Sequence, residues 1–158
     1  LFNLTPVARQ VVSLFSAIAN AKEIELINRI EGKFDIFADE DMIKTVLRNL
    51  ISNAIKFTYT GGQVELSLAD SGDCWTIYVK DNGKGIPKDL QTHLLKSDEY
   101  ITTYGTHNEK GSGLGLILCR DFIRMNKGKL HFCSQEGIGT TFYFTIPKAS
   151  SSAKAAKR

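Results

Sequence analysis

The hydrophobic positions of this sequence recur with two different periods. Hydrophobic residues spaced three or four apart predict helices, and residues that alternate at every second position predict strands. The helices are expected at Pro6–Ala21, Asp39–Phe57, Ser112–Asn126 and, as a short element, near Pro87–Leu95. The strands are expected at Ile24–Ile30, Phe34–Phe37, Val64–Ala69, Trp75–Val79, Lys129–Ser134 and Thr140–Ile146.

The order of these elements predicts the fold class. Thr5 is the expected N-cap of the first helix, because Pro6 suits the first turn. We expect that helix to bury a stripe formed by Val7, Val11, Leu14, Phe15 and Ile18. Phe34–Phe37 is expected to pair with Ile24–Ile30. The order α, ββ, α, ββ, α, ββ predicts an α/β (α+β) two-layer sandwich. Its mixed sheet would have about five or more strands, with three main helices on one face.

The predicted helix Asp39–Phe57 has two chemically different faces. One broad face is hydrophobic and comprises Ile43, Val46, Leu47, Leu50, Ile51 and Ala54. Asn49, Asn53 and Lys56 share the other face, because residues three and four apart lie above one another on a helix. A solvated polar face is the simpler explanation, yet asparagine is a poor helix former. Amide oxygens suit Mg²⁺ and an ammonium suits phosphate, which favours a binding role.

Two glycine-rich loops add candidate chemistry. Asp81–Ile86 (DNGKGI) follows a predicted strand, where Asp81 can cap a loop or accept a hydrogen bond from an exocyclic amine such as that of adenine. The glycines would let a flat ring approach the backbone. Gly111–Leu116 (GSGLGL) opens a helix, so its amides can hold phosphates. It is neither a P-loop nor the dinucleotide fingerprint, and each loop alone is a weak signal.

Length and charge limit the possible classes of protein. The 158 residues fit one domain, expected at 1–148, followed by a flexible basic tail or linker at 149–158. The net charge is +3, but four of the 20 basic residues lie in the last eleven positions, so the other 16 face 17 acidic residues. This balance argues against a nucleic-acid-binding face. No hydrophobic run approaches the ~20 residues of a membrane-spanning helix. Since the sequence starts at Leu1 without a signal peptide, we expect a piece of a longer protein.

The cysteines and histidines do not form a metal-binding or disulfide pattern. Cys74, Cys119 and Cys133 are odd in number and include no CxxC pair, so reduced thiols are expected. His93, His107 and His131 lie far apart, and none is at a metal-ligand spacing.

The polar helix face and the two loops, taken in this order, resemble a known family. The chain resembles the ATP-binding catalytic domain of bacterial sensor histidine kinases, which has the Bergerat fold shared with gyrase, Hsp90 and MutL. Asn49–Thr58 (NLISNAIKFT) resembles the family's N box. Asp81–Ile86, Gly111–Leu116 and Gly137–Phe142 (GIGTTF) resemble its three glycine boxes. The resemblance covers about Leu4 to Pro147.

The resemblance implies roles at the matching positions. Asn53 would coordinate a Mg²⁺ ion bound to ATP, with Asn49 nearby, and Lys56 would contact the phosphates. Asp81 would bind the adenine amine, Gly85 would make room for the ring, and Thr140 would support the ring through water. About 95–110 would form the ATP lid. The full set of implied nucleotide-binding residues is Asn49, Asn53, Lys56, Phe57, Asp81, Gly83, Gly85, Ile86, Lys110, Gly111, Ser112, Gly113, Leu114, Gly115, Leu116 and Thr140.

The sequence departs from the family at two places in this region. Many members have a phenylalanine-rich box ahead of the lid that ends in an arginine, whereas Leu94–Tyr100 lacks both phenylalanines and has tyrosine in place of the arginine. Lys110 is a candidate substitute for that arginine. Phe57 stands where some members have tyrosine. No phosphoacceptor motif such as HExR occurs, so the acceptor histidine is expected on a separate helical hairpin.

The sequence is compatible with several functions. Hydrolytic members carry a glutamate four positions before the Mg²⁺-binding asparagine, where this sequence has Asn49, which favours phosphoryl transfer to histidine over ATP hydrolysis. A non-catalytic nucleotide-binding module and a serine kinase acting on anti-sigma partners are two further possibilities. For the histidine kinase, the expected partners are the dimerisation hairpin of its own parent and a response regulator, and no nucleic acid. The fragment is expected to be monomeric and cytoplasmic, as the cytoplasmic part of a membrane-bound sensor or otherwise.

Overall fold

The computed structural model describes residues 1–92, 94 and 115–148. Its helices are α1 (Leu4–Ala21), α2 (Glu40–Phe57), α3 (Lys88–Gln91) and α4 (Gly115–Met125). Its strands are β1 (Phe2–Asn3), β2 (Glu25–Asn28), β3 (Asp35–Ile36), β4 (Gln63–Asp70), β5 (Cys74–Asp81), β6 (Leu130–Gln135) and β7 (Gly139–Pro147). Among the described helices, none combines the length and the hydrophobicity that crossing a membrane requires.

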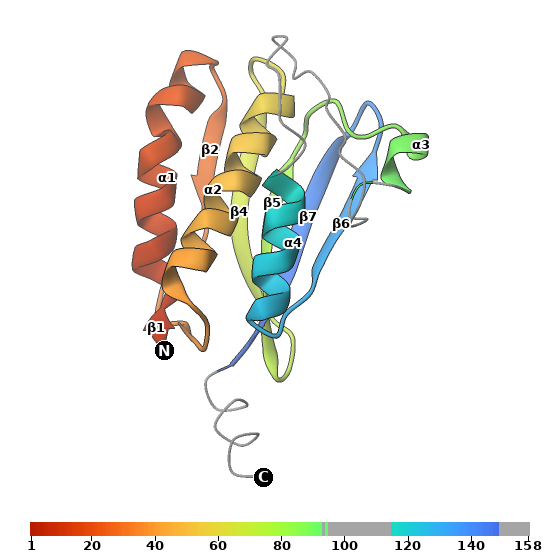
Figure 1. Cartoon of the computed structure of the whole chain (residues 1–158). Helices are drawn as coiled ribbons and strands as arrows, with labels where there is room; N and C mark the ends of the chain where they lie inside the picture. Colours follow the sequence, from red (N-terminus) through yellow and green to blue (C-terminus); the bar gives the residue numbers. More distant parts are fainter. Residues whose placement is uncertain (93, 95–114, 149–158) are drawn as a thin grey trace.

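A five-stranded mixed sheet forms one layer of the molecule. Its strand order is β2-β4-β5-β7-β6, in which only β2 and β4 pair in parallel. Helices α1, α2 and α4 cover one face of this sheet, and α3 lies beyond its β6 edge (Figure 1). The predicted two-layer sandwich with a mixed sheet is therefore confirmed.

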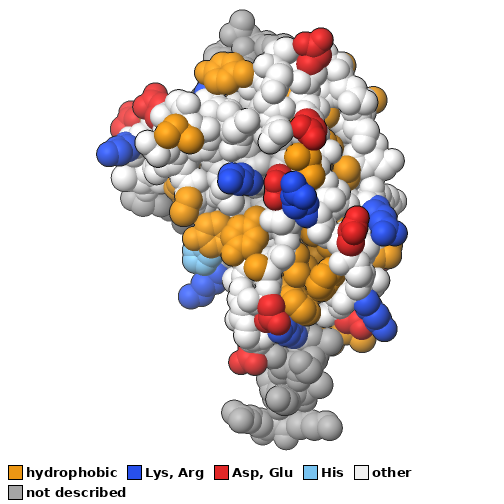
Figure 2. All heavy atoms as spheres, turned by 180° about the vertical axis from the view of Figure 1, so that it is seen from behind, with side chains coloured by type: hydrophobic (Ala, Val, Ile, Leu, Met, Phe, Trp, Pro, Cys, Tyr) orange, Lys and Arg blue, Asp and Glu red, His pale blue; other side chains and the backbone are white. Residues whose placement is uncertain are grey.

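The other face of the sheet carries no helix in the described part of the chain. Figure 2 views this side, where hydrophobic side chains gather among scattered charged ones. Three rings stack in a row on it, since Tyr143 lies 5.6 Å from Tyr78 and 5.2 Å from His131 between ring centroids. Because strand side chains alternate between faces, the residues on either side of each of these point into the core.

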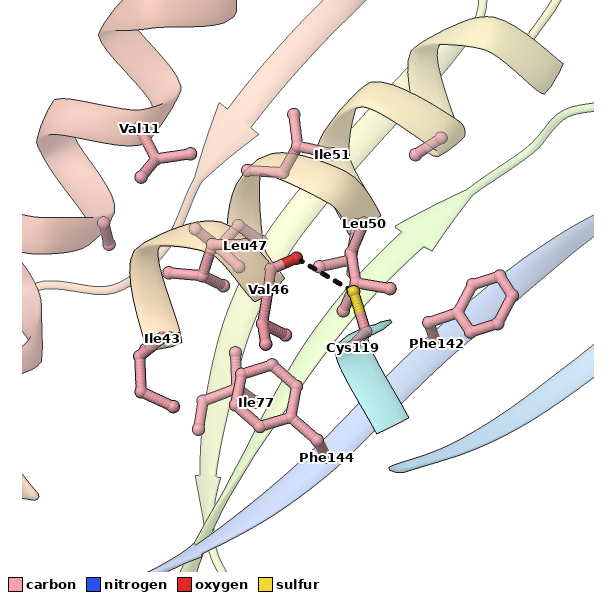
Figure 3. Close-up of a cluster of buried hydrophobic side chains, with 14 of the residues drawn as sticks. Val11, Ile43, Val46, Leu47, Leu50, Ile51, Ile77, Cys119, Phe142 and Phe144 are labelled. Atoms are coloured by element: carbon pink, nitrogen blue, oxygen red, sulfur yellow. Dashed lines mark hydrogen bonds between the residues drawn. The ribbon is translucent and has the colours of Figure 1, made fainter. Parts of the chain in front are cut away.

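The hydrophobic face of α2 occupies the centre of the core. The residues predicted for that face are buried, and they pack against Ile77 and Phe144 of the sheet and against Cys119 of α4 (Figure 3). The Cys119 thiol donates to the Val46 carbonyl at 3.8 Å, and burial raises its pKa to about 12. All three cysteines are free thiols. The core thus holds α2 rigidly, with its polar face turned away from the sheet.

The start of the chain corrects two expectations. The N-cap of α1 is Asn3 rather than Thr5: the Asn3 side chain accepts from the Thr5 amide at 3.2 Å, and the Thr5 hydroxyl donates to the Gly32 carbonyl at 2.7 Å. Strand β3 pairs with β1 in a separate two-stranded sheet and does not pair with β2. The reason is that Asn3 also accepts from the Phe34 amide at 3.0 Å, which ties the segment before β3 to the N-terminus.

The buried stripe of α1 is narrower than predicted. Leu4, Val7, Ala8 and Val11 are buried, but Leu14 and Ile18 are 58% and 55% exposed. Helix α1 lies at the end of the helical layer and contacts only α2 and β2 extensively, so its outer flank has no covering element among the described residues.

A buried lysine caps the C-terminal end of α2. The Lys22 ammonium donates to the carbonyl oxygens of Ile55 and Lys56, each at 2.9 Å, and Lys22 is only 8% exposed. A cation at this end also opposes the negative end of the helix dipole. Lys22 therefore fixes the turn of α2 that carries Lys56 and Phe57.

Replacing Lys22 with methionine is expected to destabilise the domain. Methionine keeps the hydrophobic stem but leaves two helix-terminal carbonyls without this donor, at a cost of about 1–3 kcal/mol in the free energy of unfolding. Urea denaturation measures the change. Lys80→Met, at an exposed position, is the control and should alter stability by less than about 0.5 kcal/mol. Equal effects of the two substitutions would show that the Lys22 hydrogen bonds do not support the fold.

Candidate nucleotide-binding site

A cavity of about 430 Å³ lies at the end of the sheet where α2 finishes. Its walls come from the C-terminal half of α2, from the loop after β5 and from the turn between β6 and β7. Six of the residues predicted from sequence line it: Asn53, Phe57, Asp81, Gly85, Ile86 and Thr140. Eight further residues line it that were not among the implied nucleotide-binding residues: Ala54, Tyr59, Lys84, Pro87, Leu90, Glu136, Gly137 and Phe142.

The other predicted residues stand outside the cavity wall or outside the described residues. Asn49, Lys56, Gly83, Gly115 and Leu116 are described but do not line the cavity. The Asn49 amide nitrogen donates to the Thr45 carbonyl at 3.0 Å, and a Cβ on Gly115 would lie 3.2 Å from the Asn49 amide oxygen. Helix α4 therefore begins against Asn49. Lys110, Gly111–Leu114, the predicted lid at 95–110 and the tail at 149–158 lie outside the described residues.

Asp81 is the buried carboxylate of the cavity. It ends β5, is 6% exposed, and accepts hydrogen bonds on Oδ1 from the amides of Gly83 (2.9 Å) and Thr140 (3.2 Å). Burial raises the pKa of Asp81 to about 6, and these two hydrogen bonds offset part of the rise. Both bonds fall on Oδ1, and no bond from a described residue is found at Oδ2, so a donor inside the cavity can approach that oxygen.

Gly83 brings the loop after β5 against the end of α2. A Cβ on Gly83 would collide with the Phe57 carbonyl oxygen and lie 2.9 Å from Thr58 Cα. The next amide, that of Lys84, donates to the same Phe57 oxygen at 3.0 Å. Glycine is therefore needed at position 83 for this close approach, which joins the α2 and β5 sides of the cavity.

Gly85 joins the same loop to the turn between β6 and β7. Its φ is +69°, and a Cβ there would collide with the Gln135 carbonyl oxygen. The Gly137 amide donates to the Lys84 carbonyl at 2.7 Å, which closes the contact. The expectation from the resemblance was that Gly85 makes room for a ring. The structure adds a second requirement for glycine, because the backbone of β6 passes directly beside it.

Thr140 and Ile86 are connected through Ser134. The Ile86 amide donates to the Ser134 hydroxyl at 2.8 Å, and that hydroxyl lies 2.8 Å from the Thr140 hydroxyl. Thr140 is buried, and its amide bonds Asp81. One hydrogen-bonded network therefore positions the Asp81 carboxylate and the wall formed by Ile86.

Two lysine side chains approach the Phe57 ring. The ammonium nitrogens of Lys56 and Lys84 lie 5.0 Å and 5.2 Å from the ring centroid. Phe57 and Lys84 line the cavity, whereas Lys56 does not line it but contacts the Phe57 ring. A buried carboxylate and the cation of Lys84 therefore line the cavity, and a second cation, that of Lys56, lies beside the Phe57 ring.

Sequence signals existed for some of the cavity residues that were missed. Lys84 stands between the two glycines of the Asp81–Ile86 loop, so its place in the wall could have been suspected. Ala54 and Phe142 belong to the hydrophobic faces of α2 and β7, and periodicity does not separate a cavity floor from the rest of a core. Tyr59 and Glu136 lie in turns and carried no distinguishing pattern.

Comparison with known proteins identifies the class to which this site belongs. Residues 38–150 match the model of the histidine kinase-, DNA gyrase B- and HSP90-like ATPases, so the chain belongs to that ATP-binding family. The sequence is 32% identical over 146 residues to the adaptive-response sensory kinase SasA of Crocosphaera subtropica. That match covers 91% of this chain but only 38% of SasA. The chain therefore spans well under half of this relative.

Solved structures agree with the sequence comparison. The catalytic domain of the histidine kinase ThkA has a TM-score of 0.78 and 31% identity, and the match covers 93% of each chain. ThkA is also known in complex with the response regulator TrrA (TM-score 0.74, 29% identity, 94% of this chain and 41% of that one). ShkA in complex with AMPPNP matches with a TM-score of 0.78 and 29% identity, over 94% of this chain and 30% of ShkA. These relatives place the chain among the catalytic domains of protein-histidine kinases.

Proposed function

We propose that this domain binds Mg-ATP in the cavity beside α2 and donates the γ-phosphoryl group to a histidine on a separate helical hairpin of its parent kinase. The observation that carries the proposal is the buried Asp81 carboxylate, which lines the cavity and whose Oδ1 is held by two amides. A buried acceptor of this kind favours a ligand that supplies a donor, because leaving the charge without one is costly.

Adenine fits the chemistry of this end of the cavity. Its exocyclic amine would donate to Asp81 Oδ2, and the hydrophobic side chains of Ile86 and Phe142 would contact the ring. Thr140 would support the ring through a water molecule, as the family resemblance implies. Guanine has a carbonyl oxygen at the place of the amine. Two acceptors, this oxygen and the Asp81 carboxylate, would then face each other without a hydrogen bond.

The polar face of α2 fits the phosphates and their metal ion. Asn53 lies on the cavity wall and offers an amide oxygen, which suits a Mg²⁺ ion that takes its other ligands from water and phosphate. Asn49 stands one turn earlier, and Lys56 follows at the end of the helix. When bound, Mg²⁺ would neutralise charge that develops on the transferring phosphoryl group. The amides of Gly111–Leu116 would complete the phosphate contacts.

Asn49 favours transfer to histidine over hydrolysis. An amide cannot accept the proton of an attacking water, and the Asn49 nitrogen already donates to the Thr45 carbonyl. A neutral imidazole nitrogen is itself a nucleophile and needs no such base. The domain would then contribute positioning and charge stabilisation. The ThkA–TrrA complex supports a response regulator as the downstream partner. The monomeric state, the cytoplasmic location and the absence of nucleic-acid binding stay predictions.

Replacing Asn53 with alanine tests both parts of this proposal, the binding of Mg-ATP and the transfer of the γ-phosphoryl group. The variant is expected to lose the Mg²⁺ dependence of ATP binding and to bind Mg-ATP at least about 10-fold more weakly, because loss of a metal ligand should cost no less than loss of an outer-shell partner. Calorimetric titration with and without Mg²⁺ measures this effect. A chimera in which this domain replaces the catalytic domain of ThkA should form acid-labile phosphohistidine from ATP labelled at the γ-phosphate, and the chimera with Asn53→Ala should not.

The control is Asn20→Ala, an exposed asparagine of α1 that does not line the cavity. It should bind Mg-ATP as the unaltered domain does. A chimera that binds Mg-ATP tightly yet forms no phosphohistidine would contradict the proposed phosphoryl transfer. The domain would then be a nucleotide-binding module.

A further inference from the structure

Two lysine side chains contact the ring of Phe57, a residue that lines the cavity. Lys56 comes from the last turn of α2, and Lys84 comes from the loop after β5. Both ammonium nitrogens lie within 5.2 Å of the centroid of the same ring, which is inside the range of about 6 Å for a cation–π contact. The ring is therefore a shared contact of two lysines that belong to different elements of the chain.

The backbone fixes Lys84 from both directions. Its amide donates to the Phe57 carbonyl at 3.0 Å, and its carbonyl accepts from the Gly137 amide at 2.7 Å. The loop therefore cannot move away from α2 without losing bonds on both sides. Lys84 lines the cavity, as Phe57 does, so it borders the space that a ligand would occupy.

The two ammonium groups bring positive charge to the Phe57 side of the cavity, so the negative charge of a phosphate chain bound there would be attracted to it. Lysine is a point charge with a flexible stem, which suits phosphate oxygens. Asp81 lines the same cavity, which therefore offers an acceptor for a base as well as a cation for a phosphate chain.

We propose that Lys84 is a second phosphate-binding lysine of this domain, and that the Phe57 ring positions Lys84 and Lys56 together for the phosphate chain of the nucleotide. This inference rests on the proposed function and adds a ligand-binding residue to it. The contribution of Lys84 should grow with the number of phosphates, because its interaction is with their charge and not with the base.

The test is calorimetric titration of Lys84→Met with ATP, ADP and adenosine. Methionine keeps an unbranched stem able to contact Phe57 and removes the charge. We expect ATP affinity to fall about tenfold, as for the loss of one partly solvated charge contact, ADP affinity to fall less, and adenosine affinity to stay within about twofold. Lys84→Arg should restore most of the ATP affinity. Lys80→Met, on the exposed part of β5, is the matched control and should change none of the three.

Phe57 variants test the positioning role. Phe57→Tyr should keep ATP affinity, since the ring remains, and Phe57→Leu should lower it. Lys84→Met should then cost much less in the Phe57→Leu background than alone, because the two residues act through one contact.

The outcomes separate this inference from the proposed function. If the unaltered, folded domain does not bind ATP, the proposed function fails and the role of Lys84 fails with it. If the unaltered domain binds ATP but Lys84→Met binds ATP equally well, or loses ATP and adenosine to the same extent, the phosphate role of Lys84 is wrong while the proposed function stands.

Discussion

Asp81→Asn is expected to weaken ATP binding by about 10- to 150-fold, the value of one hydrogen bond to a charged group. The amides of Gly83 and Thr140 both donate to Oδ1 and would hold the asparagine oxygen there. The asparagine NH₂ group would then face the cavity in place of Oδ2. Because the adenine amine is also a donor, two donors would meet where a donor and an acceptor are required.

The same substitution is expected to stabilise the domain at neutral pH. The pKa of Asp81 rises from its ordinary 3.8 to about 6 because burial disfavours the charged carboxylate. Above pH 6 the folded state holds that charge at a cost of about 3 kcal/mol. Asparagine carries no such cost, so the variant should exceed the unaltered domain in free energy of unfolding by up to this amount.

The pH dependence follows from the direction of the pKa shift. Between pH 3.8 and about 6 the folded state binds more protons at Asp81 than the unfolded state does. The stability contributed by protonation is therefore fully present below pH 3.8 and is lost as the pH rises through about 6. The advantage of Asp81→Asn should shrink as the pH falls. ATP affinity of the unaltered domain should fall as Asp81 becomes protonated.

Urea denaturation at several pH values and ATP titration measure these two effects. Asp70→Asn is the control, since Asp70 is exposed and bonded to Lys148, which holds the pKa of Asp70 below its ordinary value. This variant should keep ATP affinity and gain no stability. An Asp81→Asn protein that is less stable than the unaltered domain at every pH would mean that the carboxylate serves the fold and not a ligand.

Gly83→Ala is the second substitution with a large expected effect. The added Cβ collides with the Phe57 carbonyl oxygen, and backbone cannot swing aside as a flexible side chain can. We expect a loss of about 1–3 kcal/mol in the free energy of unfolding. The shift would also displace the bond from the Lys84 amide to Phe57, so ATP affinity should fall together with stability.

Gly72→Ala is the control that separates the effect of a Cβ collision from the general effect of placing alanine at a glycine position. Gly72 has φ +84° but no atom within 4 Å of an added Cβ, so alanine there meets backbone strain of about 1 kcal/mol and no collision. It lies in the β4–β5 turn, at the opposite end of β5 from Asp81, and should leave ATP affinity unchanged. If Gly83→Ala also kept full ATP affinity, the close approach of the loop to α2 would not be needed for the site.

Much of the architecture could be predicted because it depends on local periodicity. The face of α2 formed by Ile43, Leu47 and Leu50 follows from a spacing of three and four residues, and the five-stranded sheet follows from alternation. The pairing of β3 with β1 could not be predicted, since it depends on Asn3 bonding the distant Phe34 amide. The exposure of Leu14 likewise depends on which element lies beside α1.

The residues of the candidate site could likewise be predicted only in part. Asn53 and Asp81 could be selected because their chemistry is unusual for a mid-helix position and a strand end. Ala54 and Phe142 could not, because they follow the same pattern as the core. The placement of Lys84 beside the Phe57 ring required the contact between the loop and α2 that Gly83 permits.

A nuclear magnetic resonance titration of the labelled domain with Mg-ATP tests the central claim most directly. The claim predicts saturable shifts at the amides of Gly83, Gly85, Ile86 and Thr140, together with the Asn53 side-chain amide, and no shifts on the uncovered face around Tyr78 and Tyr143. A folded domain whose spectrum does not change up to millimolar Mg-ATP, or changes only on that uncovered face, would contradict it.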